Sequence, residues 1–446
     1  MHLETAPSYG ELLQKLGGDA AVRVLTAVGV SRDLDRYVHW DKLRHLEPPS
    51  GLNSEEWWFA LTAARASEKR LLPLTDATGS PFTYGLPDLV LEHLHHIDQR
   101  CGGEVAMDEV VTSEQQAGQR FLVNSLMEEA IRSSQLEGAT TSRRVAKEML
   151  RSGREPKNRS ERMIANNYRA LQYMHEEMGD TLSPDSILEL HRIVTDGTLD
   201  DPSAAGRLQR PDEDRVAVFD RDDGRPIHTP PPAEQLPERM DALCDFANEA
   251  ENGDRFIHPV IRAILLHFWL AYDHPFEDGN GRTARILFFW MMRASGYWLA
   301  EYLPISRFIR AAPAQYARAF METETDSGDT TYFLLNQLDV IEKAIADLHV
   351  YLQRKIAEIH DVEELLDVAE DLNGRQLSAL TEAARHPGSI HTFGSHARSH
   401  RVTHETARSD LSALADRGLL LRRRRGRTYV FEAPPDLAGR LKESGQ

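Results

Sequence analysis

Apolar residues recur at helical spacing along most of this 446-residue chain. Between Thr112 and Glu137 they form a rough stripe that stops at Gly138, a residue favoured just past a helix C-terminus. A longer stripe from Ile341 to Val368 predicts an amphipathic helix that links two domains and offers a surface for a homodimer. The pattern therefore predicts a mainly α fold, with one helix over about 113–137 and a linker helix over 351–372.

The first 105 residues read as a mostly helical region with one interruption. Turn residues from Ala77 to Ser80 divide LLPLTDATGSPFTY into the two arms of a predicted hairpin. Before it, either Asn53 or Ser54 is placed to cap a helix that begins at SEEWWFAL. No group of residues in this region is typical of a catalytic site.

The stretch from His258 to Leu287 carries the strongest chemical signal. Its first half is apolar enough for a buried helix, its HPFEDGNG segment favours a tight loop, and its last residues begin a second helix. Gly279 and Gly281 allow successive backbone N–H groups to turn toward one point, and the start of the second helix also favours an anion there. The sequence therefore predicts an anion-binding loop between two helices.

Charged side chains beside this loop fit phosphate chemistry. Arg282 and Arg285 lie three apart in the predicted first helical turn, where the helix dipole disfavours a cation unless a polyphosphate lies between them. Asp278 is suited to a divalent cation that bridges phosphate oxygens, because Mg²⁺ favours one or two carboxylates plus substrate oxygens. His274, at the end of the first helix, is placed to act as a base. Each feature alone is usually structural, and only their combination favours phosphate chemistry.

This combination resembles the HPFx(D/E)GNGRxxR signature of the Fic family, whose commonest members transfer AMP from ATP to a protein hydroxyl. The matching residues are His274, Pro275, Phe276, Gly279, Asn280, Gly281, Arg282 and Arg285. The resemblance implies that His274 is the general base toward a target Ser, Thr or Tyr, that Asp278 is the Mg²⁺ ligand, and that Phe276 anchors the loop. It implies that ATP is held by Gly279, Asn280, Gly281, Arg282 and Arg285.

The nucleotide donor is an inference from this resemblance. The phosphate-transferring Doc branch of the family has Ala and Lys at the positions of Gly279 and Gly281, so this chain falls outside that pattern. Relatives that transfer phosphocholine share the signature. The resemblance therefore favours ATP as the donor and leaves phosphocholine transfer open.

A second motif lies at the end of the helix predicted over 113–137. Ser133 and Glu137 are spaced i, i+4 and face the same side of the last turn, where a solvated pair is the ordinary interpretation. Together with Gly138 they resemble the (S/T)xxxE(G/N) inhibitory motif of Fic proteins, which implies that Glu137 pairs with Arg285, bidentately if well aligned, and displaces ATP from its reactive pose. In some relatives the same Glu positions a water that removes AMP from a modified target, and that alternative stays open.

A short hairpin is predicted shortly before the signature. Val216, Val218 and Ile227 favour two strands, and Pro226 marks the second one as an edge strand. The hairpin resembles the flap that pairs with the target backbone in Fic proteins, with Val216 and Val218 as candidate docking positions. An ordinary surface hairpin is the alternative.

Charge and composition narrow the choice of partners. The net charge of −18 argues against wholesale nucleic-acid or membrane binding, and the apolar windows are too short for a membrane span. Cys101 and Cys244 are too few for a disulfide framework or a zinc site, and the N-terminus lacks the apolar segment of a signal peptide. These features favour a cytoplasmic protein.

The C-terminal part differs in charge. Residues 371–446 hold 13 Lys and Arg against 8 Asp and Glu, a net charge of +5, so the preceding residues carry −23. The segment from Asn373 resembles a winged helix-turn-helix, with one helix after Asn373, a second through His396 to His400, a recognition helix in THETARSDLSALADRGLL, and a wing around Gly426. Such a module binds DNA through residues 373–432, or it contacts protein.

The expected organisation is an N-terminal region over 1–105, a Fic domain with its inhibitory helix over 106–350, a linker helix over 351–372 and a winged-helix domain over 373–446. Two functional classes compete. One is an autoinhibited adenylyltransferase that modifies target proteins and itself; the other is a DNA-binding regulator in which the Fic core senses a nucleotide. The target protein, the modified side chain and the oligomeric state lie beyond the sequence.

Overall fold

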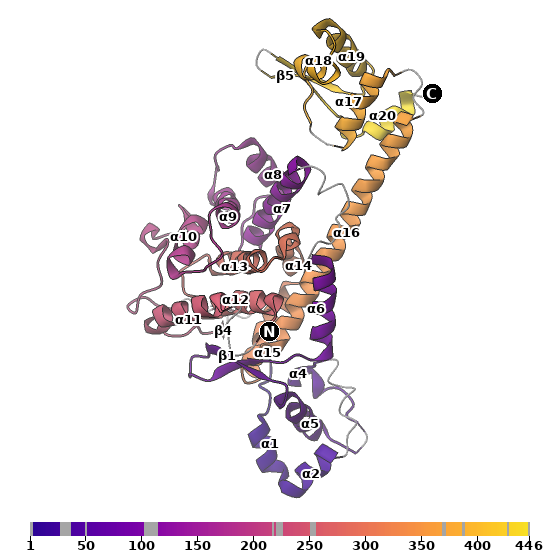
Figure 1. The fold of residues 1–446 in the computed structure, drawn as a ribbon. Helices are drawn as coiled ribbons and strands as arrows, with labels where there is room; N and C mark the ends of the chain where they lie inside the picture. Colours follow the sequence, from indigo (N-terminus) through magenta and orange to yellow (C-terminus); the bar gives the residue numbers. More distant parts are fainter. Residues whose placement is uncertain are drawn as a thin grey trace. The chain divides into compact units, whose positions relative to one another are not determined.

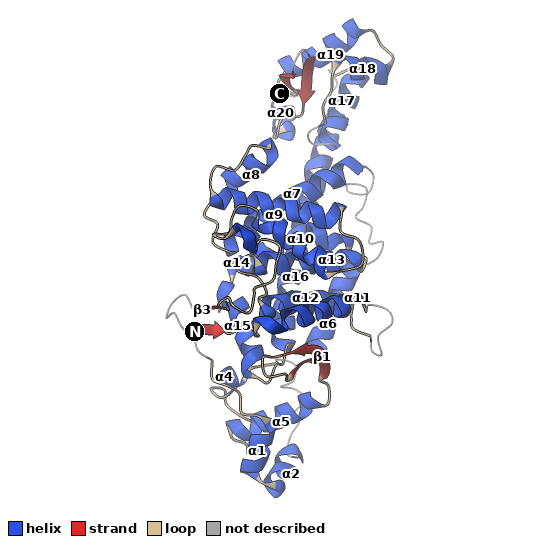
Figure 2. Ribbon diagram, turned by 90° about the vertical axis from the view of Figure 1, so that its left-hand side faces the viewer, coloured by secondary structure: helices blue, strands red, loops and turns tan. Residues whose placement is uncertain are grey.

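The computed structural model describes residues 3–26, 37–49, 51–101, 115–215, 218–219, 226–249, 256–367, 372–385, 389–425 and 428–444. Helices dominate these residues, and the strands among them form two-stranded antiparallel sheets (Figure 1, Figure 2). The predicted mainly α fold is confirmed. None of the helices in the described ranges is both long and apolar enough to span a membrane.

Two compact units divide the chain. The larger one comprises Met1–Val105 and Leu122–Ile345, and the C-terminal one comprises Ala106–Phe121 and Ala346–Gln446. The described residues among the first 105 therefore belong to the same unit as the HPFEDGNG loop. The long helix α16 (Thr331–Asp367) begins in the larger unit and ends in the C-terminal unit. Its first residue, Thr331, lies ten residues before Ile341, where the predicted apolar stripe begins.

The N-terminal part of the larger unit contains four described helices: α1 (Tyr9–Leu16), α2 (Gly18–Thr26), α4 (Trp40–Leu43) and α5 (Ser54–Ala66). Asn53 caps α5: its side-chain oxygen accepts from the Glu56 backbone N–H, and the Glu56 carboxylate accepts from the Asn53 backbone N–H. Trp57 and Trp58 are buried in the core that these helices share. The predicted hairpin is confirmed as β1 (Arg70–Thr75) and β2 (Pro81–Tyr84), and α6 (Asp88–Cys101) follows.

A helical bundle makes up the rest of the larger unit. Its helices are α7 (Gln115–Leu136), α8 (Arg143–Ser152), α9 (Arg159–Glu176), α10 (Pro184–Thr195), α11 (Leu236–Asn248), α12 (Pro259–Asp273), α13 (Asn280–Ala294), α14 (Ile305–Ala311) and α15 (Pro313–Thr325). Helix α12 is buried around nearly its whole circumference, as its apolar sequence requires, and packs along α13. This pair holds the HPFEDGNG loop at one end (Figure 1).

The hairpin predicted before the signature is present as two short strands, β3 (Val218–Phe219) and β4 (Pro226–His228), paired antiparallel. Val216 and residues 220–225, between the two strands, lie outside the described residues. The last residue of β4, His228, is buried and donates from Nε2 to the Tyr272 carbonyl at 2.6 Å. The hairpin is therefore tied to the end of α12, two residues before His274.

From residue 346 onward, the C-terminal unit contains the end of α16 followed by α17 (Gly374–Arg385), α18 (Phe393–His400), α19 (His404–Asp416), β5 (Leu421–Arg425), β6 (Thr428–Glu432) and α20 (Leu437–Ser444). Its core contains Leu380, Leu411, Leu414, Leu420 and Phe431. Three helices thus precede one antiparallel hairpin, in the order that the sequence predicted, while Gly426 at the hairpin turn lies outside the described residues.

Candidate active site at the HPFEDGNG loop

The loop between α12 and α13 reverses the chain through two left-handed residues. His274 caps α12 with φ 44° and ψ 53°, and its N–H still donates to Leu270. This conformation costs a non-glycine residue about 1–2 kcal/mol, so surrounding contacts must hold it. Gly279 starts α13 with φ 88°, and a Cβ there would lie 2.9 Å from the Thr195 side chain. The glycine at this position therefore has a steric reason, as its place in the motif predicted.

Three neighbours hold the loop backbone in place. The Asn280 side chain accepts from the Phe276 N–H at 2.9 Å and donates to the Phe276 carbonyl at 2.7 Å. Arg215 donates from Nη2 to the carbonyls of Asp273 and His274, at 2.7 and 3.2 Å. The Gln209 N–H donates to the Pro275 carbonyl at 2.9 Å. Both groups of the Asn280 side-chain amide are thus bonded to the loop backbone. The predicted contact of Asn280 with ATP stays a prediction.

Phe276 anchors the loop through His191 of α10. The Phe276 side chain is fully buried, and its ring stacks on the His191 ring with 3.8 Å between centroids. His191 accepts from the Gly206 N–H at Nδ1, so its Nε2 carries the proton and donates to the Asp278 carbonyl at 2.9 Å. Burial lowers the pKa of His191 to about 4, which keeps the ring neutral. The inward role expected of Phe276 is seen, and His191 is a site residue that the sequence analysis missed.

The His274 imidazole is suited to accept a proton. Its Nδ1 lies 3.4 Å from the Ala271 carbonyl, which can only accept, so the proton sits on Nδ1 and the lone pair on Nε2. Burial is the largest influence on this ring and, with the nearby charge of His228, lowers the pKa of His274 to about 4. The opposing charge of Glu137 acts on the same ring. At neutral pH the ring is therefore an unprotonated base.

Arg285 is hydrogen-bonded to residues at the C-terminal end of helix α7. The buried guanidinium donates from Nε to the Ser133 hydroxyl at 2.9 Å, and from Nη2 to Glu137 Oε1 at 2.8 Å and to the Ser133 carbonyl at 3.3 Å. The Glu137–Arg285 pair implied by the second motif is thus present, but through one carboxylate oxygen rather than a bidentate fork. Gly281 leaves the space for this contact, since a Cβ there would clash with Glu137 Oε1.

Arg282 lies in a different setting from Arg285. Its fully buried guanidinium donates from Nη1 to the Val194 carbonyl at 3.1 Å and from Nη2 to Asp278 Oδ1 at 3.2 Å. It ties α13 to the end of α10 and orients Asp278. In this structure Arg282 is bonded to protein groups and Arg285 is bonded to Ser133 and Glu137. The prediction that a polyphosphate lies between the two arginines stays a prediction.

An anion and a metal ion both fit the start of α13. No side chain caps this helix, so the first-turn N–H groups remain available to phosphate oxygens. The Asp278 carboxylate is about one-third exposed and also lies 3.7 Å from Arg159. No cluster of three or more metal-binding side chains occurs in the described part of the chain. Asp278 is the carboxylate that would hold Mg²⁺ together with phosphate oxygens of a substrate.

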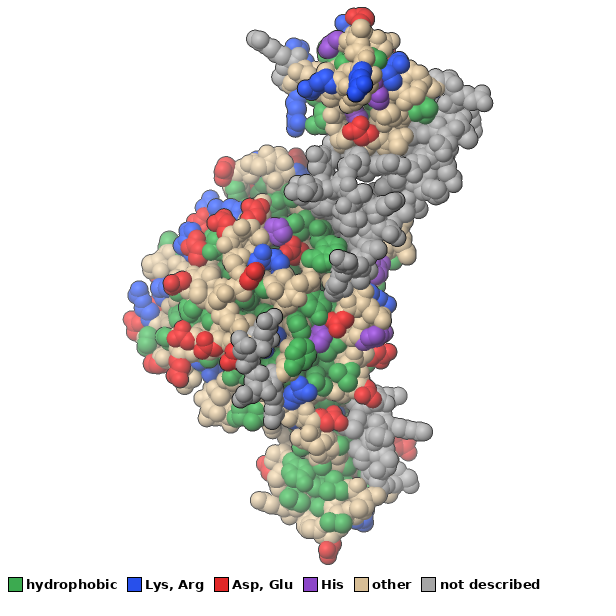
Figure 3. Space-filling view, viewed as in Figure 1, with side chains coloured by type: hydrophobic (Ala, Val, Ile, Leu, Met, Phe, Trp, Pro, Cys, Tyr) green, Lys and Arg blue, Asp and Glu red, His purple; other side chains and the backbone are tan. Residues whose placement is uncertain are grey.

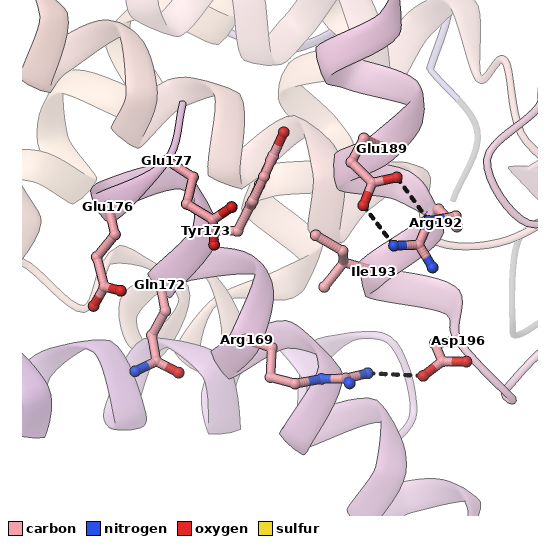
Figure 4. A pocket seen from close by; sticks show the side chains of 9 residues that line it. All are labelled: Arg169, Gln172, Tyr173, Glu176, Glu177, Glu189, Arg192, Ile193 and Asp196. Carbon is pink, nitrogen blue, oxygen red and sulfur yellow. Dashed lines mark hydrogen bonds and ion pairs between the residues drawn. The ribbon is translucent and has the colours of Figure 1, made fainter. Parts of the chain in front are cut away.

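A separate surface pocket of about 390 Å³ lies between α9 and α10 (Figure 4). Its wall includes two ion pairs, Arg169 with Asp196 at 2.9 Å and Arg192 with Glu189 at 2.5 Å. None of the residues that line it belongs to the signature or to the second motif. We assign it no part in the chemistry of the loop.

Comparison with known proteins identifies the class of this domain. Residues 181–292 match the Fic/DOC family. The chain is 34% identical over 131 residues to the protein adenylyltransferase Fic of Nematostella vectensis, a match that covers 29% of this chain and 27% of the relative. It is 37% identical over 118 residues to protein adenylyltransferase fic-1 of Caenorhabditis elegans, covering 26% and 20%. The chain thus spans about a quarter or less of the curated relatives that it matches.

Solved structures agree on the fold. A Fic family protein from Desulfovibrio desulfuricans G20 aligns with a TM-score of 0.51 at 19% identity, covering 79% of this chain and 98% of that one. A variant of Fic-1 from C. elegans aligns with a TM-score of 0.50 at 20% identity, covering 79% and 90%. Residues 181–292, which contain the loop described above, therefore match the Fic/DOC family in sequence, and the fold is similar to that of the solved Fic family protein.

Proposed function

We propose that this protein is an autoinhibited adenylyltransferase that transfers AMP from ATP to Ser, Thr or Tyr hydroxyls of target proteins and of itself. The observation that carries the proposal is the pairing of an unprotonated His274 Nε2 with an uncapped α13 N-terminus at one loop. A base and an anion site at the two ends of a short loop are what phosphoryl-group transfer to a hydroxyl requires. The matched relatives, named as adenylyltransferases, support ATP as the donor.

The transfer needs few parts. His274 Nε2 takes the proton of the target hydroxyl while the hydroxyl oxygen forms a bond to the α-phosphorus of ATP. The bond between the α- and β-phosphates breaks, and pyrophosphate leaves with the electron pair. The first-turn N–H groups of α13 hold phosphate oxygens, and Asp278 would hold Mg²⁺, which neutralises charge on the phosphates. The β3–β4 hairpin, tied to Tyr272 through His228, would pair with the target backbone beside the loop.

Inhibition follows from the position of Arg285. Its guanidinium is the group that would grip the γ-phosphate of ATP, and α7 occupies it through Ser133 and Glu137. With Arg285 occupied, ATP lacks one contact that sets the α-phosphorus in line with the hydroxyl. The resting protein is then a poor transferase until the carboxylate of Glu137 leaves.

Intact-mass spectrometry tests the proposal. The Glu137→Gly protein, incubated with ATP and Mg²⁺, is expected to gain the mass of one or more AMP groups, while the Glu137→Gly/His274→Ala protein gains none. The added mass identifies the transferred group, so a phosphocholine donor is examined in the same way with CDP-choline. Equal labelling of the two proteins would refute His274 as the base, and no added mass with ATP would refute adenylyl transfer.

Removal of AMP is a second candidate activity. The Glu137 side chain is about 31% exposed and its charge acts on His274, so its carboxylate can reach a water at the site. The test incubates AMP-labelled Glu137→Gly protein with wild type. Release of AMP by wild type, but not by Glu137→Gly, would support it, and stable label would refute it.

A further inference from the structure

The hairpin of the C-terminal unit carries a basic surface that its own fold does not explain. Strand β5 contains four consecutive arginines, Arg422–Arg425, and all four are exposed. Side chains alternate between the two faces of a strand, so both faces of β5 lie in solvent here. Lys and Arg side chains gather on this unit in the space-filling view (Figure 3). Four neighbouring like charges repel one another, which a polyanionic partner would offset.

The contacts of Arg422 and Arg423 leave these two side chains exposed. Arg422 lies over the ring of Tyr429, with 5.7 Å to the centroid, and Arg423 approaches Glu432 only to 3.8 Å. Tyr429 is itself 47% exposed. An exposed aromatic ring among arginines, on a hairpin with a net positive charge, is a surface typical of nucleic-acid contacts.

Helix α19 is held rigidly in the same unit. Its inner face is buried at Ala407, Leu411 and Leu414. Asp410, also buried, accepts from Arg375 at 2.7 Å and lies 3.4 Å from His396 of α18, so α19 is fixed to α17 and α18. A turn of three residues separates α18 from α19, as in a helix-turn-helix.

The outer face of α19 is polar and lies next to the hairpin. Arg408 and Ser409 are exposed on this helix, and Thr403 caps its start. The ring of Phe393 contacts both His404, at the start of α19, and Tyr429 of β6, with centroid distances of 5.6 and 6.4 Å. The start of α19 and the arginine hairpin therefore lie side by side within this unit.

We propose that the C-terminal unit binds duplex DNA, with α19 in the major groove and the β5 arginines on the phosphate backbone. A helix with side chains is about 10–12 Å across and fits the major groove of B-form DNA, which is about 12 Å wide. The deep, narrow major groove of duplex RNA excludes it. This activity goes beyond the adenylyl transfer proposed above and does not depend on it.

Fluorescence anisotropy with the full chain tests the proposal. The probe is a labelled duplex of random sequence, titrated at salt concentrations from 50 to 300 mM. Each phosphate contact contributes about 0.9 to the slope of log K against log salt, so four or five contacts predict a slope of about −4. The Arg423→Ala/Arg425→Ala variant should lose about two units of slope and weaken binding roughly 50-fold at 0.1 M salt.

A matched variant controls for net charge. Arg144 and Lys147 lie on a basic face of α8 in the larger unit, so Arg144→Ala/Lys147→Ala removes the same charge from another surface and should leave DNA binding unchanged. Arg423→Lys/Arg425→Lys keeps the charge and should keep the slope, and unchanged melting temperatures show that the variants fold.

Several results would overturn the proposal. These are no binding down to 50 mM salt, equal losses in the hairpin and α8 variants, equal affinity for duplex RNA, or capture of an acidic peptide such as poly-glutamate in preference to the duplex. The last result would assign the surface to a protein partner instead.

Discussion

Replacing Glu137 by glycine should raise the rate of AMP transfer, and the contacts of Arg285 set the size of the effect. The guanidinium makes one bond to Glu137 and two to Ser133, so the substitution removes the charged contact and leaves two neutral ones. A hydrogen bond between charged groups contributes about 1.5–3 kcal/mol. Since each 1.4 kcal/mol changes a population about tenfold, we expect activation of roughly 10- to 100-fold.

The Ser133 contacts provide a graded comparison. Ser133→Ala removes a neutral hydroxyl bonded to the guanidinium at 2.9 Å and should activate several-fold, less than Glu137→Gly. The double variant should exceed either single variant, because both side chains hold the same group. Helix α7 ends at Leu136, so glycine at position 137 disturbs the helix little.

The assay is transfer of label from α-labelled ATP, with Glu128→Ala as the matched control. Glu128 is another ion-paired glutamate of α7, but its partners are Arg132 and Arg143 rather than Arg285. Its loss should leave the rate near that of wild type. Equal rates for wild type and Glu137→Gly, or equal activation by Glu128→Ala, would refute the reasoning.

Four further predictions follow from the site and its surroundings. His191→Phe keeps a ring against Phe276 but loses the bonds to the Asp278 carbonyl and the Gly206 N–H, so both kcat and the melting temperature of the Glu137→Gly protein should fall, kcat at least tenfold. Because the pKa of His274 is lowered to about 4, the ring stays unprotonated above that value, and its titration should cause no loss of transfer rate of the Glu137→Gly protein between pH 8 and 6. A loss of that rate with an inflection near pH 6.5 would contradict this. Burial raises the pKa of Glu129 to about 7, so the stability that its protonated form contributes is full below about pH 4.5 and is lost as pH rises through 7. The loss in the free energy of unfolding is on the order of 3 kcal/mol. Thermal melts from pH 5 to 8 should show this decline, and Glu129→Gln should remove it. Chelation of Mg²⁺ should abolish transfer, and Asp278→Asn should raise the Mg²⁺ concentration needed for half-maximal rate by tenfold or more.

The sequence predicted the elements of the site better than their mutual contacts. It placed His274 at the end of one buried helix, and it gave Gly279 a turn that φ 88° now shows. It also paired Glu137 with Arg285, residues 148 positions apart, but only through a resemblance to known motifs. Local sequence pattern was sufficient for His274 and Gly279, because helix periodicity and glycine geometry are local properties.

Contacts between distant segments lay beyond local pattern. His191 stands on α10 in an apolar stretch and reads as an ordinary core histidine, although it stacks on Phe276 and bonds the Asp278 carbonyl. Arg215 has no motif of its own. The contacts of Asn280 with the loop and of Arg282 with α10 could not be predicted either, because the signature names these residues but not their partners in the fold. Which donor meets which carbonyl depends on tertiary packing, which a single sequence does not display.

The account rests on a competition between Glu137 and the γ-phosphate of ATP for Arg285, and nucleotide affinities measure it most directly. Isothermal titration of ATP and ADP gives the ratio of their dissociation constants for wild type and for Glu137→Gly. ADP lacks the γ-phosphate. The dissociation constant of ADP divided by that of ATP should therefore be near one in wild type and should rise tenfold or more in the variant. The same ratio in both proteins would contradict the account.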